Sequence, residues 1–380
     1  MAFDRKLVKH IDWGIVLSVS AILGISLAVL WSASRGMVPG DPFYYVKRQA
    51  TWMLLGGAGL IVLLFIDYGL LAHASRYLYM LNVAILILVL LVGTKAHGTK
   101  GWINMGPFLF QPSEFSKVLT ILTFSSFLST REGHIHTWKD LLSCFAYVAP
   151  PVLLVLLQPD MGTALVFGAI VVGMLFIAGA NPAMLCTIAG GAIGCLVLAL
   201  VAHFRWGLPL PLEEYQIMRL VVFIDPYADG QGGQGAGYNI IQSLVAIGSG
   251  AFWGRGLGQG TQAHLNFLPE HHTDFIFSVV GEELGFVGAA GILALYFYFL
   301  YRSLRIAYEA KDNYGTLVAC GIVSMIAFHL LVNVGMTIGI MPITGIPLPL
   351  FSYGGSAMIS NLVAVGLIIN IGMRRHKILF

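Results

Sequence analysis

The sequence is poor in charged residues and in cysteine. Charged residues make up 10% of the 380-residue chain, against about 25% in an ordinary soluble domain. The net charge is only +3, and no long basic stripe carries interleaved aromatic residues, so the chain makes no case for nucleic-acid binding. The four cysteines lie in apolar runs without the paired spacing of a metal site, which favours buried hydrophobic roles for them.

Long hydrophobic runs dominate what remains, and hydrophobic residues make up 57% of the chain. A membrane-spanning helix needs about 20 mostly apolar residues. The runs therefore predict an all-α polytopic membrane protein in which residues 1–380 form a single integral membrane domain. The first run follows basic residues but is longer than a signal peptide core, so it is expected to remain as the first span. The ten predicted spans are 13–32, 49–66, 77–93, 113–129, 143–157, 161–178, 183–203, 273–300, 315–340 and 352–373.

Lysine and arginine are unevenly distributed around these spans. With the N-terminus inside, inner segments hold more of them than the short outer loops, which predicts that both termini lie in the cytoplasm. Residues 204–272 then form a large outer loop between the seventh and eighth spans. Within this loop, residues 238–247 have apolar side chains at roughly helical spacing and are expected to lie along the membrane surface. The inner residues are Arg5, Lys6, Lys9, Arg76, Arg131, Lys139, Arg302, Arg305, Lys311, Arg374, Arg375 and Lys377, and the outer ones Arg35, Lys47, Arg48, Lys95 and Lys100.

Two carboxylates and two histidines gather where the outer loop meets the eighth span, in residues 270–274. Ionisable groups at a water–membrane boundary are typical of functional sites, and Asp274 is the main candidate, with His271 beside it. If a helix starts here, Asp274, Ser278 and Glu282 share one face, and Glu282 lies about 12 Å deeper. The alternative is that Asp274 only caps the helix.

Further polar candidates lie at other predicted span ends. Glu114 and Lys117 are i, i+3 neighbours that either form a structural ion pair or line a cavity, where Lys117 would meet a phosphate. Asp160 is either a helix cap or a second carboxylate near Lys117. Arg219 lies among apolar residues and needs an anionic partner such as pyrophosphate, and Arg48 is a second outer cation with that potential.

Three prolines interrupt the segment 342–350, just before the tenth span, and Gly354, Gly355 and Ser356 follow it. Non-helical backbone at membrane depth is tolerated only against protein or a water-filled cavity. The segment therefore predicts either a re-entrant turn that serves packing alone or a place where a ligand approaches closely. Ser356 joins the candidate cavity residues on this basis.

Taken together, these motifs resemble the SEDS family (shape, elongation, division and sporulation), the polytopic glycosyltransferases of bacterial cell-wall synthesis. The similarity to the RodA branch rests on residues 246–250 and 260–262. The motifs that carry the resemblance occur in order at 111–114, 158–163, 241–243, 246–250, 260–262, 267–270, 272–277, 282–285, 345–350 and 352–356.

The resemblance implies a GT-C-like SEDS fold of ten spans in the bacterial inner membrane. It also implies polymerisation of lipid II into glycan strands during cell elongation, in complex with a class B penicillin-binding protein. The aspartate that matches Asp274 is the family's catalytic candidate, and residues matching Glu114, Lys117 and Asp160 line the cavity beneath it. As general base, Asp274 would serve an inverting glycosyl transfer in which undecaprenyl pyrophosphate leaves.

Two rival functions remain open at this point. A lipid II flippase would need polar groups through the whole membrane depth, whereas the polar groups here cluster toward the outer face. A non-catalytic scaffold for the penicillin-binding protein would not depend on Asp274. No cluster of ligands demands a metal, although a divalent cation (Mg or Mn) could share the stabilisation of the leaving pyrophosphate.

Overall fold

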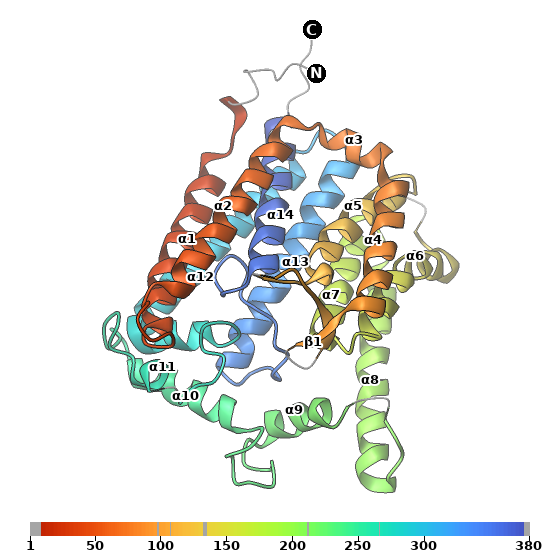
Figure 1. The fold of residues 1–380 in the computed structure, drawn as a ribbon. Coiled ribbons are helices and arrows are strands. Elements are labelled where there is room, and N and C mark those ends of the chain that lie inside the picture. Colours follow the sequence, from red (N-terminus) through yellow and green to blue (C-terminus); the bar gives the residue numbers. More distant parts are fainter. Residues whose placement is uncertain are drawn as a thin grey trace.

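The computed structural model describes residues 9–96, 99–106, 108–131, 135–210, 213–265 and 267–375. Long helices run side by side in a bundle, and shorter elements cross one end of it (Figure 1). Of the residues used to predict orientation, Arg5, Lys6 and Lys377 lie outside the described ranges. The helices are α1 (Trp13–Ser34), α2 (Tyr44–Phe65), α3 (Tyr68–His73), α4 (Ser75–Val92), α5 (Pro112–Ser129), α6 (Trp138–Leu156), α7 (Met161–Ile177), α8 (Pro182–Trp206), α9 (Glu214–Ile224), α10 (Tyr238–Gly250), α11 (Thr261–His264), α12 (Ile276–Tyr308), α13 (Asn313–Thr337) and α14 (Gly355–Met373).

Each of the ten predicted spans corresponds to one long helix. In the described ranges, eight of these helices are long and apolar enough to cross a membrane. The other two are α7, which is apolar but has 17 residues, and α5, whose first two turns carry Glu114 and Lys117. The prediction of an all-helical membrane fold is confirmed.

The short helices α3, α9 and α11 and a small sheet were not predicted. Residues between α4 and α5 form a small antiparallel sheet in the order β1-β2-β3, with strands Thr94–Ala96, Thr99–Asn104 and Leu109–Phe110. These strands are too short to show an alternating pattern in the sequence. The helix α10, by contrast, confirms the helical spacing predicted for residues 238–247.

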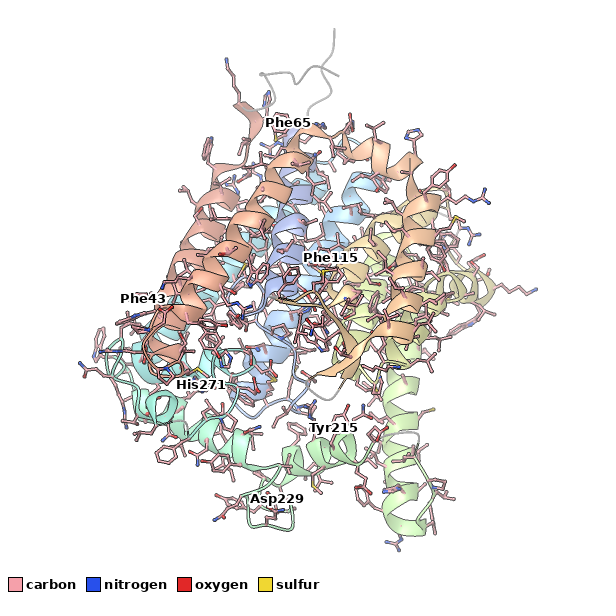
Figure 2. All side chains as sticks on the ribbon, in the orientation of Figure 1. Phe43, Phe65, Phe115, Tyr215, Asp229 and His271 are labelled. Atoms are coloured by element: carbon pink, nitrogen blue, oxygen red, sulfur yellow. The ribbon has the colours of Figure 1, made fainter. Side chains whose placement is uncertain are left out.

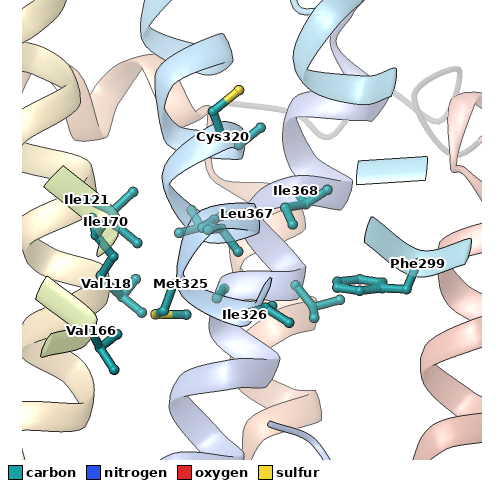
Figure 3. Close-up of a cluster of buried hydrophobic side chains, with 14 of the residues drawn as sticks. Val118, Ile121, Val166, Ile170, Phe299, Cys320, Met325, Ile326, Leu367 and Ile368 are labelled. Carbon is teal, nitrogen blue, oxygen red and sulfur yellow. The ribbon is translucent and has the colours of Figure 1, made fainter. Parts of the chain in front are cut away.

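Helix α13 lies at the centre of the bundle. It packs against α5, α7, α12 and α14, and Figure 3 shows Val118 of α5 and Val166 of α7 beside Met325 of α13. On another side of this cluster, Phe299 of α12 points toward Ile326. The interior of the bundle between these helices therefore contains a large cluster of buried apolar side chains.

Helix α8 is the opposite case, because only 6% of its most apolar window is buried within the protein. It projects past the ends of the neighbouring helices in Figure 1. Cys186 and Cys195 lie on this helix and are exposed, so the expectation that all four cysteines are buried holds only for Cys144 and Cys320. An isolated, apolar helix in contact with lipid explains why these two cysteines sit in a hydrophobic run without being buried in protein.

The two ends of the bundle differ in what they carry. At one end, Arg302 of α12 approaches Asp12, the residue before α1, at 2.6 Å, and Arg375 after α14 lies 4.0 Å from the same carboxylate. The outer-loop helices α9 to α11 lie at the other end (Figure 1). Figure 2 shows Tyr215, His271 and Asp229 at that second end and Phe65 at the first. Which end faces the cytoplasm stays a prediction.

Candidate functional site

A cavity of about 370 Å³ lies at the end of the bundle that carries α9. Its wall combines the first turns of α5, α7 and α14, one face of α9, the turn before α12, part of α13 and the segment 344–347. The lining therefore comes from positions spread over more than half of the chain. The ionisable side chains among its lining residues are Glu114, Lys117, Asp160, Arg219, Glu270, Asp274 and His329, together with two tyrosines.

Six of the nine predicted site residues meet at this cavity. Three others do not line it: Arg48, His271 and Glu282. The six lining residues are Glu114, Lys117, Asp160, Arg219, Asp274 and Ser356.

Asp274 does not lie on a helix. Helix α12 begins at Ile276, so Asp274 belongs to the preceding turn and does not share a helical face with Ser278 and Glu282. Ser278 instead forms a hydrogen bond with Ser243 of α10 at 2.7 Å. The predicted polar stripe descending from Asp274 is therefore wrong.

Glu282 has a different role from the one its spacing suggested. Its carboxylate accepts hydrogen bonds from the backbone N–H groups of Thr261 at 2.7 Å and Gln262 at 3.1 Å, and Arg255 lies 4.0 Å away. The same part of α12 breaks at Gly285, where φ is +64°, and the backbone of residues 251–254 packs against the break. Glu282 thus holds the outer loop against α12.

His271 and Arg48 lie near the cavity wall. The ring nitrogens of His271 lie 2.6 Å from the Leu268 carbonyl and 2.9 Å from the Ala33 carbonyl, so this buried ring ties the turn to α1. Arg48 donates to the Tyr44 hydroxyl at 2.9 Å and lies near Tyr353, which does line the cavity. Burial raises the pKa of Tyr353, and the charge of Arg48 acts in the opposite direction.

The turn that carries Asp274 is pinned from two later elements of the chain. The Asn333 side chain, on α13, donates to the carbonyl of Asp274 at 2.9 Å and to that of Ile346 at 2.8 Å. The Ser352 hydroxyl donates to the carbonyl of Thr273 at 2.6 Å. These bonds fix the backbone that carries Asp274 and so limit the positions that its side chain can reach, as the orientation of a catalytic group requires.

Asp274 and Arg219 face the same glycine. A methyl group added to Gly345 would lie 3.4 Å from Oδ2 of Asp274 and 3.8 Å from Nη1 of Arg219. Arg219 donates to the Thr344 carbonyl at 3.3 Å, and its guanidinium lies 5.3 Å from the Tyr215 ring centroid. Because φ of Gly345 is +74°, glycine is favoured here for its backbone as well as for space.

Glu114 and Lys117 form a buried ion pair of 2.7 Å, and His329 of α13 lies 2.9 Å from the lysine nitrogen. The side chains of both paired residues are at most 5% exposed. Both also line the cavity. The sequence left two alternatives open, a structural ion pair or residues that line a cavity. The structure shows that Glu114 and Lys117 do both.

Asp160 and Ser356 tie together three helix starts. Asp160 caps α7 by accepting from the backbone and hydroxyl of Thr163 at 2.9 and 2.8 Å, and it accepts from the Gln111 side chain at 3.3 Å. The backbone N–H of Gln111, just before α5, donates to the Ser356 hydroxyl on α14 at 2.9 Å. The N-termini of α5, α7 and α14 thus converge on the cavity, and each favours negative charge.

Sequence reasoning missed Asn333 and His329, which lie in the long apolar helix α13. The available signal was that polar side chains inside a span face the protein interior. Among the residues whose placement is described, no group of three or more histidine, cysteine, aspartate or glutamate side chains is arranged to hold a metal ion. The cavity therefore offers carboxylates and cations rather than a preformed metal site.

Comparison with known proteins gives the family that the sequence motifs resemble, and the match covers almost the whole chain. The family model for FtsW, RodA and SpoVE, described as "Cell cycle protein", matches residues 12–377. Stage V sporulation protein E of Bacillus subtilis (strain 168) is 38% identical, covering 95% of this chain and 96% of that protein. A probable peptidoglycan glycosyltransferase FtsW of Trichlorobacter lovleyi is 36% identical, with coverages of 95% and 92%. Peptidoglycan glycosyltransferase MrdB of Escherichia coli (strain K12) is 35% identical, with coverages of 97% and 95%.

A solved structure supports the fold independently. It is described as showing the structural coordination of polymerization and crosslinking by a peptidoglycan synthase complex. One of its chains matches with a TM-score of 0.77 at 32% identity, covering 97% of this chain and 99% of that chain. The fold and the cavity thus define a multi-pass membrane enzyme. The chain belongs to the SEDS family of peptidoglycan glycosyltransferases.

Proposed function

We propose that this chain polymerises lipid II into glycan strands at the cavity, with Asp274 as the general base. The observation that carries the proposal is the placement of the half-buried Asp274, whose backbone carbonyl accepts a hydrogen bond from Asn333, with its carboxylate beside the same Gly345 as the cation of Arg219. A base and a cation that face one space suit a reaction in which a proton is removed while an anion leaves.

The proposed reaction is a glycosyl transfer with inversion. The 4-hydroxyl of the acceptor N-acetylglucosamine attacks C1 of the donor N-acetylmuramic acid, and the bond from C1 to the pyrophosphate oxygen breaks. Asp274 takes the hydroxyl proton as the oxocarbenium-like state forms. Such base catalysis contributes about 10²–10⁴-fold, and orientation of the two lipid-anchored substrates supplies a further part.

The leaving undecaprenyl pyrophosphate requires positive charge. Lys117 of α5 and Arg219 of α9 both line the cavity. The converging N-termini of α5, α7 and α14 add partial positive charge. Arg48 interacts with Tyr353, which lines the cavity, and adds positive charge near the same space. A divalent cation, Mg or Mn, would add to this stabilisation if the reaction uses one.

The rival flippase function is less well supported by the arrangement of the bundle. A headgroup path would need polar groups through the membrane depth. Between α5, α7, α13 and α14 the interior instead contains many apolar side chains, including Ile121, Ile170 and Leu367 (Figure 3). Beyond Lys117, the buried polar side chains of α5 are uncharged serines and threonines. The polar lining stays at one end, as a glycosyltransferase that works at the membrane surface requires.

The branch of the family, the cellular role, the partner and the orientation in the membrane are further parts of this proposal. We place the chain in the RodA branch, acting in cell elongation and rod-shape maintenance, on the basis of residues 246–250 and 260–262. We also propose a class B penicillin-binding protein as its partner. The cavity end, with residues 204–272 as an extracytoplasmic loop within a single membrane domain, would face outward, and both termini would lie in the cytoplasm.

The proposal is tested with purified complexes of this chain and its class B partner, supplied with labelled lipid II. Wild type is expected to give glycan ladders, and Asp274→Asn to give none while remaining folded. The matched control is Asp225→Asn, which makes the same change at an exposed loop carboxylate and should leave the ladders intact. Equal ladders from wild type and Asp274→Asn would remove Asp274 as the base. Absence of ladders from all folded complexes supplied with divalent cation would favour the flippase or scaffold.

A further inference from the structure

His329 lines the cavity but has no role in the reaction proposed above. It lies on α13, is 2% exposed, and contacts two groups with its two ring nitrogens. Nδ1 lies 2.7 Å from the carbonyl oxygen of Met325, and Nε2 lies 2.9 Å from the Lys117 nitrogen. Lys117 in turn lies 2.7 Å from Glu114. We call Glu114, Lys117 and His329 the buried triad.

The contacts determine which ring nitrogen carries the proton. A carbonyl oxygen can only accept, so Nδ1 must donate to Met325. A lysine ammonium can only donate, so Nε2 must accept from Lys117 and carry no proton. The ring is therefore neutral, because an imidazolium would direct a second N–H at the ammonium 2.9 Å away.

This arrangement orients the ammonium of Lys117. An ammonium has three N–H donors in a tetrahedral arrangement, and the buried triad takes up two of them, one with Glu114 and one with His329. Since Lys117 also lines the cavity, the third donor is left for whatever anion occupies that space. Without an acceptor at position 329, the ammonium would rotate about its pairing with Glu114.

We infer that His329 is a positioning residue for glycosyl transfer: through the lone pair on Nε2 it holds Lys117 so that one N–H faces the leaving pyrophosphate. The inference rests on the proposed function and adds a residue to it. Its effect should appear mainly in kcat, because a donor aimed at developing charge stabilises the transition state more than the bound substrate. Loss of one such preorganised donor costs about 10²–10³-fold in well-studied sites.

Two substitutions separate this role from simple packing. His329→Leu fills similar space with no acceptor, whereas His329→Gln supplies an amide oxygen that can accept from Lys117. We expect His329→Leu to lower kcat by at least about 10-fold with little change in KM, and His329→Gln to stay within about threefold of wild type. The matched control is His73→Leu, since His73 also contacts the carbonyl four residues earlier, at 2.7 Å, but lies exposed on α3.

The measurement is the initial rate of glycan synthesis against lipid II concentration, with thermal unfolding of each complex as the check on folding. Full activity in folded His329→Leu would overturn the inference, as would a His329→Gln variant that is folded and as slow as His329→Leu. If wild type itself makes no glycan, the proposed function fails and the role in glycosyl transfer fails with it; whether His329 holds Lys117 is then decided by the ring itself.

That second test does not require any variant to be active. In wild-type protein with ¹⁵N-labelled histidine, a spectrum correlating ring nitrogens with ring protons identifies the protonated nitrogen, and the signal missing from His329→Gln assigns His329. A neutral ring protonated at Nδ1 supports the inference. A ring protonated at Nε2 or at both nitrogens contradicts it, because Nε2 could then not accept from Lys117.

Discussion

The two ends of this bundle use the same kinds of charged residue in opposite ways. At the end without the cavity, charges from separate elements pair with one another: Arg302 with Asp12 at 2.6 Å, and Arg375 with Glu309 at 2.8 Å. At the other end, Asp160 and Arg219 form hydrogen bonds with backbone, hydroxyl and amide groups, Asn333 holds the backbone of Asp274, and all three residues line a cavity of about 370 Å³.

The comparison distinguishes charged residues that stabilise the fold from charged residues that serve the reaction. Paired charges at the first end join α1, α12 and the chain after α14, so removing one should affect stability first. Charges at the cavity are positioned at a cost to the protein, since desolvated ionisable groups are expensive. Removing one of them should affect activity first.

The largest effect on stability is expected where the two uses of charge coincide, at Glu114 and Lys117. Lys117→Met leaves a buried carboxylate without its cation and should destabilise the protein by about 3–5 kcal/mol. The double variant Glu114→Gln with Lys117→Met removes both charges and should recover most of that stability without recovering activity. Thermal unfolding and glycan synthesis, measured on both variants, check this. Recovery of activity along with stability would mean that the pair serves packing alone.

A smaller loss of stability is expected from releasing the turn that carries Asp274. Asn333→Leu removes the two hydrogen bonds to the carbonyls of Asp274 and Ile346 and leaves them buried without that donor, at a cost of about 1–3 kcal/mol. Glycan synthesis should fall by more than the folded fraction falls, because Asp274 loses its fixed position. Activity that tracks the folded fraction alone would show that Asn333 does not position Asp274.

The smallest effect is expected at the outer-loop carboxylate Asp229. Backbone N–H groups, from Gly233 first and then from Gln231, Gly235 and Gly237, lower the pKa of Asp229 from 3.8 to about 2. The charged carboxylate therefore orders the loop fully above pH 3.8, and this contribution is lost as the pH falls through about 2. Hydrogen exchange of residues 229–237 should show protection that declines over this range.

The control for that prediction is Asp229→Asn, whose loop should exchange faster at neutral pH and show no transition between pH 4 and pH 2. Its glycan synthesis at neutral pH should stay within about twofold of wild type, since Asp229 is not among the residues that line the cavity. A strong loss of synthesis would place Asp229 in the reaction and weaken the contrast between loop and cavity.

The spans and most of the cavity residues could be predicted from the sequence, because hydrophobic runs and the polar residues at their ends are local signals. The environment of Asp274 could not be predicted in this way. Its turn is set by hydrogen bonds from Asn333 and Ser352, 59 and 79 residues away from their acceptors, and α12 starts two residues later than a helical reading of Asp274 requires. That shift also explains why the role of Glu282 was predicted wrongly.

The most direct test of the account compares two charge-removing variants in one assay: Asp274→Asn at the cavity and Arg302→Gln at the paired end. The measurement is the initial rate of glycan synthesis per folded complex. The account predicts a fall of at least about 100-fold for Asp274→Asn with unchanged thermal unfolding, and an unchanged rate with a lower unfolding temperature for Arg302→Gln. A folded Asp274→Asn complex that synthesises glycan at the wild-type rate would contradict it.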